Sequence, residues 1–342
     1  MGVAAIDFRP WDFGAGLGTL LLIFVMRPGS SLDSHRKQTF SPIMDIHLTE
    51  LVESGAEAAS QVLSLVRGID GLRQVEIVEA LKFTDRTQIF HITSNLGDLV
   101  AKQDLSPRAH RWTEGAWEEF QDLRSTMLDG ASRVVEVLFA RPERGLLVTR
   151  YVPGQRLVDA LSQADDMRRA ELMARAGGWV QALSAVRTRT RTRNFGADYW
   201  VKLARGRGIG ALDPEGLTLR DALIKRMAEQ APSLRGAPVE QVKGHGDLSG
   251  NNLIVSGPVI TGVDLNGTAY RPRSFDAVKL LQSLDLSLPE LHRTSEPTSG
   301  GVSQTLAAPF LATGVLPQPE REVLFGFFAC ENLVGHLTRR AA

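Results

Sequence analysis

The stretch HGDLSGNNLIV, residues 245–255, decides the fold of this chain. It places a carboxylate, Asp247, five positions before a carboxamide, Asn252, and an apolar, strand-forming run follows at once. After the turn SGP comes a second apolar run, VITGV (259–263), which is followed directly by another carboxylate, Asp264. The pattern predicts a β-hairpin with three oxygen-bearing side chains at one end.

The three side chains suit two different chemical roles. Asn252 and Asp264 offer hard oxygen ligands of the sort that suit Mg²⁺. Asp247 is then left to orient or deprotonate a hydroxyl. Phosphoryl transfer from a nucleotide needs this division, because a metal neutralises the transferring phosphate while a carboxylate positions the nucleophile.

HGDLSGNNL followed by GVDLNG resembles the catalytic loop and metal-binding segment of the aminoglycoside phosphotransferases, relatives of choline kinases and, more distantly, of protein kinases. The resemblance implies Asp247 as catalytic base, Asn252 and Asp264 as Mg²⁺ ligands, and ATP or GTP as phosphate donor. It also implies an α+β, bilobal protein-kinase-like fold, with a small mainly β N-lobe and a larger mainly α C-lobe. The loop departs from the family at Ser249 and Gly250, where a histidine and a proline are usual; neither position bears the core chemistry.

The resemblance extends upstream. DLVAKQD (98–104) is similar to the strand that carries the family's ATP-binding lysine, which falls on Lys102. LLVTRYVPGQRL (146–157) is similar to the hinge between the lobes, so backbone groups from Arg150 to Val152 are expected at the adenine edge.

Two further nucleotide contacts follow from the family pattern. TDRT occupies the place of the phosphate-covering turn but contains no glycine, so the Thr84 or Thr87 hydroxyl and backbone amides are the candidate phosphate contacts. A kinase-like lysine pairs with a helix glutamate, and we expect Glu118 in this role from its distance after Lys102. The neighbouring Glu114 and Glu119 are then expected on a solvated face.

Two residues near the loop are interpreted as structural. His245 is expected to brace the loop rather than to act as an acid–base catalyst. PRSFDAVKLL (272–281) is similar to the family segment in which an aspartate opens a helix, so Asp276 is expected to cap or hold the catalytic loop.

The remaining sequence predicts two lobes with a boundary at Pro153. Short β-branched runs and one amphipathic helix precede this residue, and mostly helical patterns follow it. We expect a poorly ordered extension over 1–43, a nucleotide-binding N-lobe over 44–152 and a C-lobe over 153–342. The expected strands are 75–81, 87–93, 98–105, 133–140 and 145–152, with one or two short helices over 44–67, a helix over 111–128, and strand structure after Pro153 only around 242–264.

The N-terminal residues 15–26, AGLGTLLLIFVM, are apolar but fall short of the roughly 20 residues of a transmembrane helix. Only Arg9 precedes them, which does not fit the basic region of a secretory signal. A start at Met44 and a membrane-proximal anchor are the alternatives to a poorly ordered extension.

Composition bounds the partners. The chain has 342 residues, 43% hydrophobic and 23% charged, with a formal net charge of zero, so nothing favours nucleic acid or an anionic membrane. The single cysteine, Cys330, fits the reducing cytoplasm and lies in an apolar run that predicts a buried helix.

The motifs of several other enzyme classes are absent from the sequence. A metallophosphoesterase needs histidine-rich GNH elements, and the sequence has no such element, no P-loop and no Gly-x-Ser-x-Gly elbow. The alternative from another class is a kinase-fold protein that binds nucleotide or a partner without catalysis. The acceptor is expected to be a small molecule with a hydroxyl; because the runs RTRTRTRN (187–194) and RPR (271–273) are basic, it is expected to be neutral or acidic rather than a polycation.

Overall fold

The computed structural model describes residues 6–8, 24–26, 42–187, 193–210, 212–266, 269–298, 301–317, 320–321 and 324–340. The chain forms two compact units. The first comprises Met1–Gln121 and Val135–Tyr151, and the second comprises Asp122–Val134 and Val152–Ala342. The second unit therefore takes in a segment, Asp122–Val134, that the sequence analysis assigned to the N-lobe.

Most of the predicted extension, 1–43, lies outside the described residues. Two short strands within it, β1 (Ile6–Phe8) and β2 (Phe24–Met26), pair antiparallel, and β2 pairs with the next strand through Val25. No helix in the described part of the chain is long and apolar enough to cross a membrane.

The first unit is built on an antiparallel sheet with the strand order β1-β2-β3-β4-β5-β8-β7. The predicted strands are confirmed here, since β-branched residues and turn residues alternate along this part of the chain. The bounds are β3 Glu76–Phe83, β4 Thr87–Ser94, β5 Gly97–Asp104, β7 Val137–Arg141 and β8 Leu146–Arg150.

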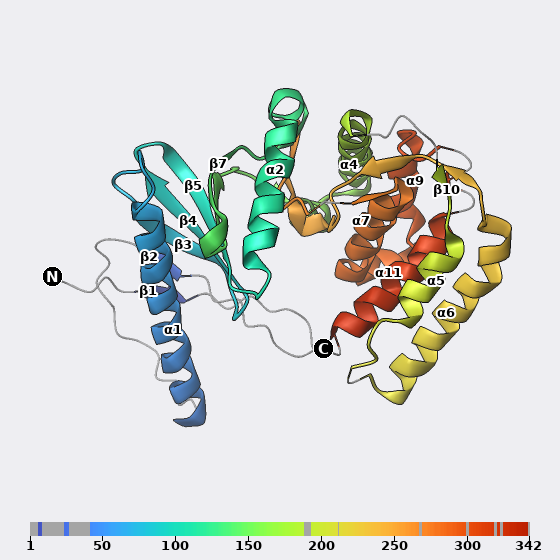
Figure 1. Cartoon of the computed structure of the whole chain (residues 1–342), viewed down its shortest axis with the longest axis horizontal. Coiled ribbons are helices and arrows are strands. Elements are labelled where there is room, and N and C mark those ends of the chain that lie inside the picture. The colour runs from blue at the N-terminus through green and yellow to red at the C-terminus, as the bar shows by residue number, and fades with distance from the viewer. Residues whose placement is uncertain are drawn as a thin grey trace. The chain divides into compact units, whose positions relative to one another are not determined.

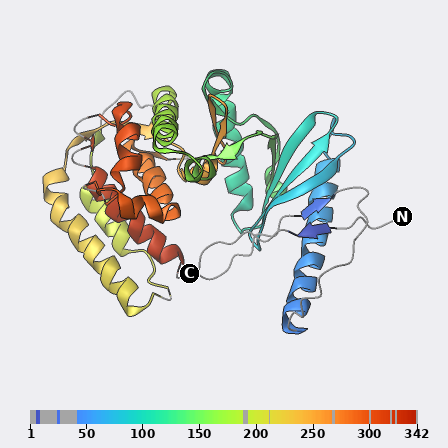
Figure 2. The same ribbon diagram turned by 180° about the vertical axis from the view of Figure 1, so that it is seen from behind.

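One face of this sheet packs against α1 (Pro42–Arg67), as both views show (Figures 1 and 2). The segment forms a single helix rather than two short ones. Ala58, Val62 and Val66 form one buried stripe along it, because residues four apart share a helix face. Alternate strand residues meet this stripe, since successive side chains point to opposite sheet faces. The buried residues of this core include Ala58, Val62, Val66 and Ile69 on or next to α1, and Ala80, Phe90, Ile92, Leu99, Ala101 and Val148 on the sheet.

Helix α2 (Ala109–Met127) follows β5, as predicted. The predicted strand over 133–140 is wrong as a single element. Its first part is β6 (Ser132–Val134), which pairs parallel with β14 in the second unit, and its second part is β7 in the first unit. Only Val135 and one charged residue, Glu136, separate the two strands. A single polar residue is ordinary within an alternating strand, so the sequence pattern does not reveal the switch.

The second unit is mainly helical, and Figure 1 shows α5, α6 and α11 lying side by side. Helices α4 and α6 begin at aspartate N-caps, Asp165 and Asp213, each of which accepts a backbone N–H of the first turn. The bounds are α3 Leu157–Ser162, α4 Asp166–Val186, α5 Ala197–Arg205, α6 Pro214–Leu234, α7 Ser274–Ser287, α8 Pro289–Thr294, α9 Gln304–Ala312 and α11 Phe325–Arg340.

An aromatic cluster and a buried polar contact hold α11 in this unit. The Phe328 ring packs edge-on against the rings of Phe195, Trp200, Phe275 and Phe327. Cys330 is buried in the same helix, as predicted, and burial raises the pKa of its thiol.

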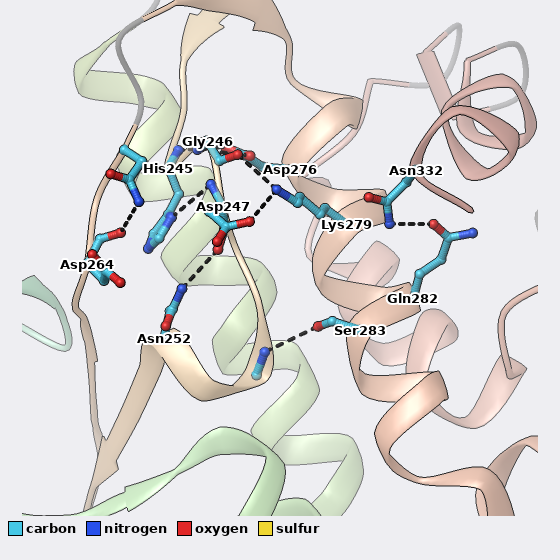
Figure 3. A network of polar contacts seen from close by, with 12 residues as sticks. His245, Gly246, Asp247, Asn252, Asp264, Asp276, Lys279, Gln282, Ser283 and Asn332 are labelled. Atoms are coloured by element: carbon cyan, nitrogen blue, oxygen red, sulfur yellow. Dashed lines mark hydrogen bonds and ion pairs between the residues drawn. The ribbon is translucent and has the colours of Figure 1, made fainter. Parts of the chain in front are cut away.

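Gln282 on α7 ties this helix to α11. Its Nε2 donates to the carbonyl of Ala329 at 3.0 Å, and its Oε1 accepts from Nδ2 of Asn332 at 2.7 Å (Figure 3). Because Gln282 is buried, these bonds satisfy polar atoms that would otherwise carry a desolvation cost.

The predicted β-hairpin is confirmed as β13 (Leu253–Ser256) and β14 (Val259–Gly262), which pair antiparallel. The expectation that strand structure in this unit is limited to 242–264 is wrong, because several strands of two or three residues lie outside that range. Such short pairings carry no alternation that a sequence pattern can reveal. They are β9 Gln155–Arg156, β10 Arg193–Asn194, β11 Pro238–Val239 and β15 Tyr270–Pro272, while β12 Gln241–Lys243 lies at the edge of the range.

Trp179 on α4 packs against the β13–β14 hairpin. Its ring is fully buried, and its Nε1 donates to the carbonyl of Arg133 on β6 at 2.7 Å. A Cβ at Gly262 on β14 would lie 2.1 Å from this ring, so only glycine allows the strand to approach so closely. Trp179 therefore fixes the position of the hairpin that carries the candidate site.

We expect Trp179→Ala to lower the free energy of unfolding by about 3–5 kcal/mol, the usual cost of removing a large buried aromatic side chain. Urea denaturation measures this loss. Trp112→Ala on α2 is the matched control, because that ring is exposed and its removal leaves no cavity. Equal effects at the two positions would contradict the role given to Trp179.

Candidate active site

The three predicted polar residues lie together at one end of the β13–β14 hairpin (Figure 3). Asp247 and Asn252 belong to the loop between β12 and β13, and Asp264 comes just after β14. Nδ2 of Asn252 donates to the carbonyl of Asp247, and the Val263 N–H donates to the carbonyl of Asn252, both at 2.9 Å. The structure thus brings together the residues that the sequence placed five and twelve positions apart.

Asp264 adopts a left-handed backbone conformation, with φ of 60°. This region costs a non-glycine residue about 1–3 kcal/mol and is found mainly where the surroundings enforce it. Two positions further on, the N–H of Asn266 donates to the carbonyl of His245 at 2.8 Å, and this bond supplies the constraint. The strain turns the chain at the point where a carboxylate leaves the hairpin, which marks Asp264 as a candidate functional residue.

His245 braces the loop in its neutral form. Its ring is fully buried, Nε2 lies 2.8 Å from the carbonyl of Val263, and Nδ1 accepts the N–H of Asp247 at 3.3 Å. A carbonyl only accepts, so Nε2 carries the proton and Nδ1 does not. Burial lowers the pKa of His245, which further favours the neutral ring. The predicted bracing role is confirmed by these contacts.

Asp276, in the first turn of α7, holds the loop backbone. Its carboxylate accepts the N–H of His245 at 2.6 Å and the N–H of Gly246 at 3.2 Å, as predicted for this residue. A Cβ at Gly244 would lie 1.9 Å from Oδ2 of Asp276, so glycine is needed for this close approach. The buried carboxylate and two amides satisfy one another.

Lys279 is a site residue that the sequence analysis missed. Its Nζ donates to the carbonyl of Gly246 at 3.0 Å and to Oδ1 of Asp247 at 2.5 Å. It lies one turn after Asp276, and residues three apart share a helix face. The spacing of Asp276 and Lys279 within PRSFDAVKLL was the available signal. A lysine on the same helix face as the residue that holds the loop also faces the loop.

The same face of α7 also contacts the end of the loop. The Gly250 N–H donates to Oγ of Ser283 at 3.3 Å, and a Cβ at Gly250 would lie 2.4 Å from Cδ2 of Leu284. The departure from the family pattern at Gly250 therefore has a packing reason: the loop lies too close to α7 for a larger residue.

The donor set suits a hard divalent cation. Asn252 uses its Nδ2 toward Asp247, which turns its amide oxygen the other way, and Asp264 adds a carboxylate. Among the described residues, no cluster of three or more His, Cys, Asp or Glu side chains is arranged to enclose a metal. Mg²⁺ is commonly held by one or two protein oxygens together with waters and substrate phosphates, so the two residues fit it.

In the first unit, Lys102 lies on β5 between Ile89 of β4 and Leu147 of β8. Its neighbours Ala101 and Gln103 are buried, and Ala101 belongs to the core formed with α1. Lys102 therefore projects from the opposite sheet face, half-buried, as a phosphate-binding lysine would.

The turn TDRT joins β3 and β4 and is closed by Thr84. Its Oγ1 accepts the N–H groups of Arg86 and Thr87 and donates to the carbonyl of Thr87, to which the Thr84 N–H also donates. The Thr84 hydroxyl is thus engaged inside the turn, a common use of threonine. Phosphate contact by Thr84 and Thr87 stays a prediction.

The hinge residues are partly engaged within the sheet. The Arg150 N–H donates to the carbonyl of Glu136 at 2.9 Å, and the Tyr151 N–H donates to the carbonyl of Asp98 at 3.0 Å. The Arg150 guanidinium pairs with Glu136 at 3.2 Å and bonds the carbonyl of Leu96. Backbone contact with a nucleotide base from Arg150 and Val152 stays a prediction.

The glutamates of α2 differ from expectation in their burial. Glu118 and Glu114 are exposed, whereas Glu119 is buried. The expectation that Glu119 lies on a solvated face is wrong, because its position on α2 falls next to the buried Phe120. The pairing of Lys102 with Glu118 stays a prediction.

A polar cluster on the Lys102 face of the sheet was also missed. The His91 ring stacks on Tyr151 with centroids 4.0 Å apart, and its two nitrogens lie 3.5 Å from the carboxylates of Glu79 and Asp98. Burial, with these carboxylates, raises the pKa of Tyr151. The strand period places His91 and Lys102 on one face, but the contact with Tyr151 depends on the chain leaving β8.

We expect His245 to make the protein less stable in acid. Burial lowers its pKa in the folded state, so below about pH 6.5 a proton binds the unfolded chain but not the folded one. The free energy of unfolding then falls with decreasing pH, by up to about 1.4 kcal/mol per pH unit from this residue.

Urea unfolding at pH 7.5 and 5.5 checks this expectation. His245→Gln removes the titrating group, so the stability difference between the two pH values becomes smaller than in the native protein. An unchanged difference would show that His245 is not the source of the acid sensitivity.

Comparison with known proteins agrees with this geometry. The model of the phosphotransferase enzyme family (APH) matches residues 77–295, more than half of the chain. The comparison with curated protein sequences gave no significant match.

Solved structures of similar fold are small-molecule kinases. An aminoglycoside 2'-phosphotransferase in complex with GDP is 18% identical, with a TM-score of 0.56, covering 84% of this chain and 91% of that chain. A complex of APH(2")-IIia with GDP and kanamycin is 16% identical, with a TM-score of 0.55 and coverage of 83% and 91%. The amicoumacin kinase hAmiN, in complex with AMP-PNP and Ca²⁺, is 14% identical, with a TM-score of 0.52 and coverage of 83% and 87%.

These structural similarities establish the common fold alone, an antiparallel sheet unit followed by a mainly helical one. The family match adds sequence similarity over residues 77–295, which include Lys102, Asp247 and Asp264. The chain therefore belongs to the phosphotransferase enzyme family, the family that also contains the aminoglycoside phosphotransferases.

Proposed function

We propose that this protein transfers the γ-phosphoryl group of ATP or GTP to a hydroxyl of a small molecule, in the presence of Mg²⁺. The observation that carries the proposal is the hydrogen-bonded network that joins the loop of Asp247 and Asn252 to the segment of Asp264. Membership of the family supports a small-molecule phosphotransferase. Similar structures with GDP, or with AMP-PNP and Ca²⁺, support a nucleotide and a divalent cation as cofactors.

In this mechanism the chain acts by positioning and by charge. Asp247 accepts a hydrogen bond, and then the proton, from the acceptor hydroxyl. Asn252 and Asp264 hold Mg²⁺, which neutralises charge on the phosphates when it is bound. Lys102 binds nucleotide phosphate oxygens, and the Thr87 hydroxyl adds a contact from the turn. No covalent intermediate with the chain is needed.

Three arginines of the two basic runs bear on the acceptor class. Arg187 is buried, and burial lowers its pKa to about 10, so it does not contribute to an exposed basic rim. Arg273 pairs with Glu240 at 2.5 Å, and Arg271 lies 4.5 Å above the Phe275 ring. Residues 188–192 lie outside the described part. A neutral or acidic acceptor, such as a sugar, a sugar phosphate or a hydroxy acid, stays our proposal, because residues 153–342 are mildly basic rather than rich in the carboxylates that a polycation needs. The buried lone cysteine fits a cytoplasmic location.

We expect Asp247→Asn to lower kcat by about 10²–10⁴, the usual contribution of a positioned general base, while nucleotide affinity changes little. The measurement is nucleotide turnover with Mg²⁺, in water and with a panel of hydroxyl acceptors including kanamycin, simple sugars and hydroxy acids. Turnover at the native rate would remove Asp247 from the mechanism.

We expect Asp264→Asn to abolish the magnesium-dependent rise in melting temperature that ATP or GTP gives the native chain. At a nucleotide concentration one hundred times Kd, binding stabilises the native protein by about 2.7 kcal/mol. Thermal unfolding with and without Mg²⁺ measures this rise and also separates ATP from GTP.

Asp166→Asn is the control for this measurement, because it also removes a carboxylate from the second unit but at an exposed position on α4. A native protein that binds Mg²⁺-nucleotide but transfers no phosphate would support the non-catalytic alternative. A native protein that binds none would contradict both.

A further inference from the structure

Three residues on one face of α7 bond to the candidate catalytic loop. Asp276, Lys279 and Ser283 are spaced i, i+3 and i+7, which places them on one stripe of a helix. Toward the loop, Asp276 and Ser283 accept backbone N–H groups. Lys279 differs from them because it bonds both to the backbone, at Gly246, and to the reacting side chain proposed above.

The geometry of Lys279 suits a fixed anchor. Its side chain is 12% exposed, whereas that of Asp247 is 61% exposed. The ammonium group is thus enclosed by protein, and the carboxylate that it binds remains open to an approaching molecule. The carbonyl of Gly246 takes a second N–H bond of the ammonium, so two acceptors define its place.

The loop itself offers no such cation. Between Asp247 and Asn252 the sequence reads LSGN, which contains no basic residue. The positive charge next to Asp247 therefore comes from a helix that is separate in sequence. A charge-assisted hydrogen bond restricts the rotation of the aspartate side chain.

We propose that Lys279 is a positioning residue for phosphoryl transfer: anchored on Gly246, it fixes Oδ1 of Asp247 and so aims the carboxylate at the acceptor hydroxyl. The inference rests on the proposed function of Asp247. A misplacement of about 1 Å at a reacting group can cost about 10²-fold in rate, so a residue that fixes such a group affects kcat strongly.

The test compares Lys279→Met, Lys279→Arg and the native full-length chain. Hydrolysis of Mg²⁺-ATP and Mg²⁺-GTP, with water as acceptor, is followed by phosphate release, and transfer is followed with any acceptor found in the panel. We expect Lys279→Met to lower kcat by about 10²-fold, with nucleotide affinity unchanged, and Lys279→Arg to recover part of the loss. Lys225→Met on α6 is the control, because that lysine is exposed.

A double-substitution cycle separates positioning from general support of the loop. If Lys279 acts through Asp247, adding Lys279→Met to Asp247→Asn lowers the rate by less than about twofold, because the group being positioned is already gone. If Lys279 only stabilises the loop, its full effect persists in the Asp247→Asn background.

The outcomes divide as follows. A Lys279→Met protein with native kcat, or effects that multiply independently in the cycle, overturns the proposal while leaving the proposed function intact. A native protein without phosphoryl transfer or hydrolysis overturns the proposed function and this inference with it. Melting temperatures are recorded for every variant; if Lys279→Met and Lys279→Arg both fail to fold, the residue is structural and the proposal falls.

Discussion

The carboxylate of Asp276 and the two backbone N–H groups that it accepts form the constraint on which the candidate active site depends. A buried carboxylate is costly unless it is paired and hydrogen-bonded, and here the pairing fixes the peptide groups of His245 and Gly246. Fixing them sets the His245 ring against Val263, and this bond joins the loop to the segment after β14. The close approach exists only because Gly244 has no side chain.

The two units position their candidate site residues in different ways. In the first, strand alternation alone sends Lys102 away from the α1 core, so one regular sheet positions the residue. In the second, the polar side chains lie where the hydrogen-bonded ladder of β13 and β14 ends and the backbone is free to bend. There, glycines and buried polar contacts replace the regular ladder, and Asp264 carries the strain in its left-handed backbone.

Much of the architecture could be predicted because it depends on local pattern. The strands of the first unit, the hairpin at 253–262 and the long helices follow from period and turn residues. The bracing by His245 and Asp276 followed from the family resemblance. The division of residues 132–141 between two sheets and the burial of Glu119 could not be predicted, because each depends on tertiary packing.

Lys279 shows a second limit of prediction from sequence. Its helical spacing from Asp276 is visible in the sequence, but a lysine on a helix is usually solvated, and nothing local distinguishes one that is enclosed. Only the path of the loop over α7 reveals that this lysine lies against an aspartate. The fold can therefore be inferred from the sequence, whereas the roles of the individual site residues are determined by measuring the reaction.

The contact of Gln282 with α11 links the C-terminal helix to α7. Helix α7 contacts the candidate catalytic loop on one face, and on another it bonds to Ala329 and Asn332 in the first half of α11. A helix moves nearly as a rigid rod, so a shift of α11 would be transmitted along α7 to the loop without any contact at the site itself. Substitution of Asn332, in the first half of α11, would then disturb the support of the candidate catalytic loop without touching the site itself.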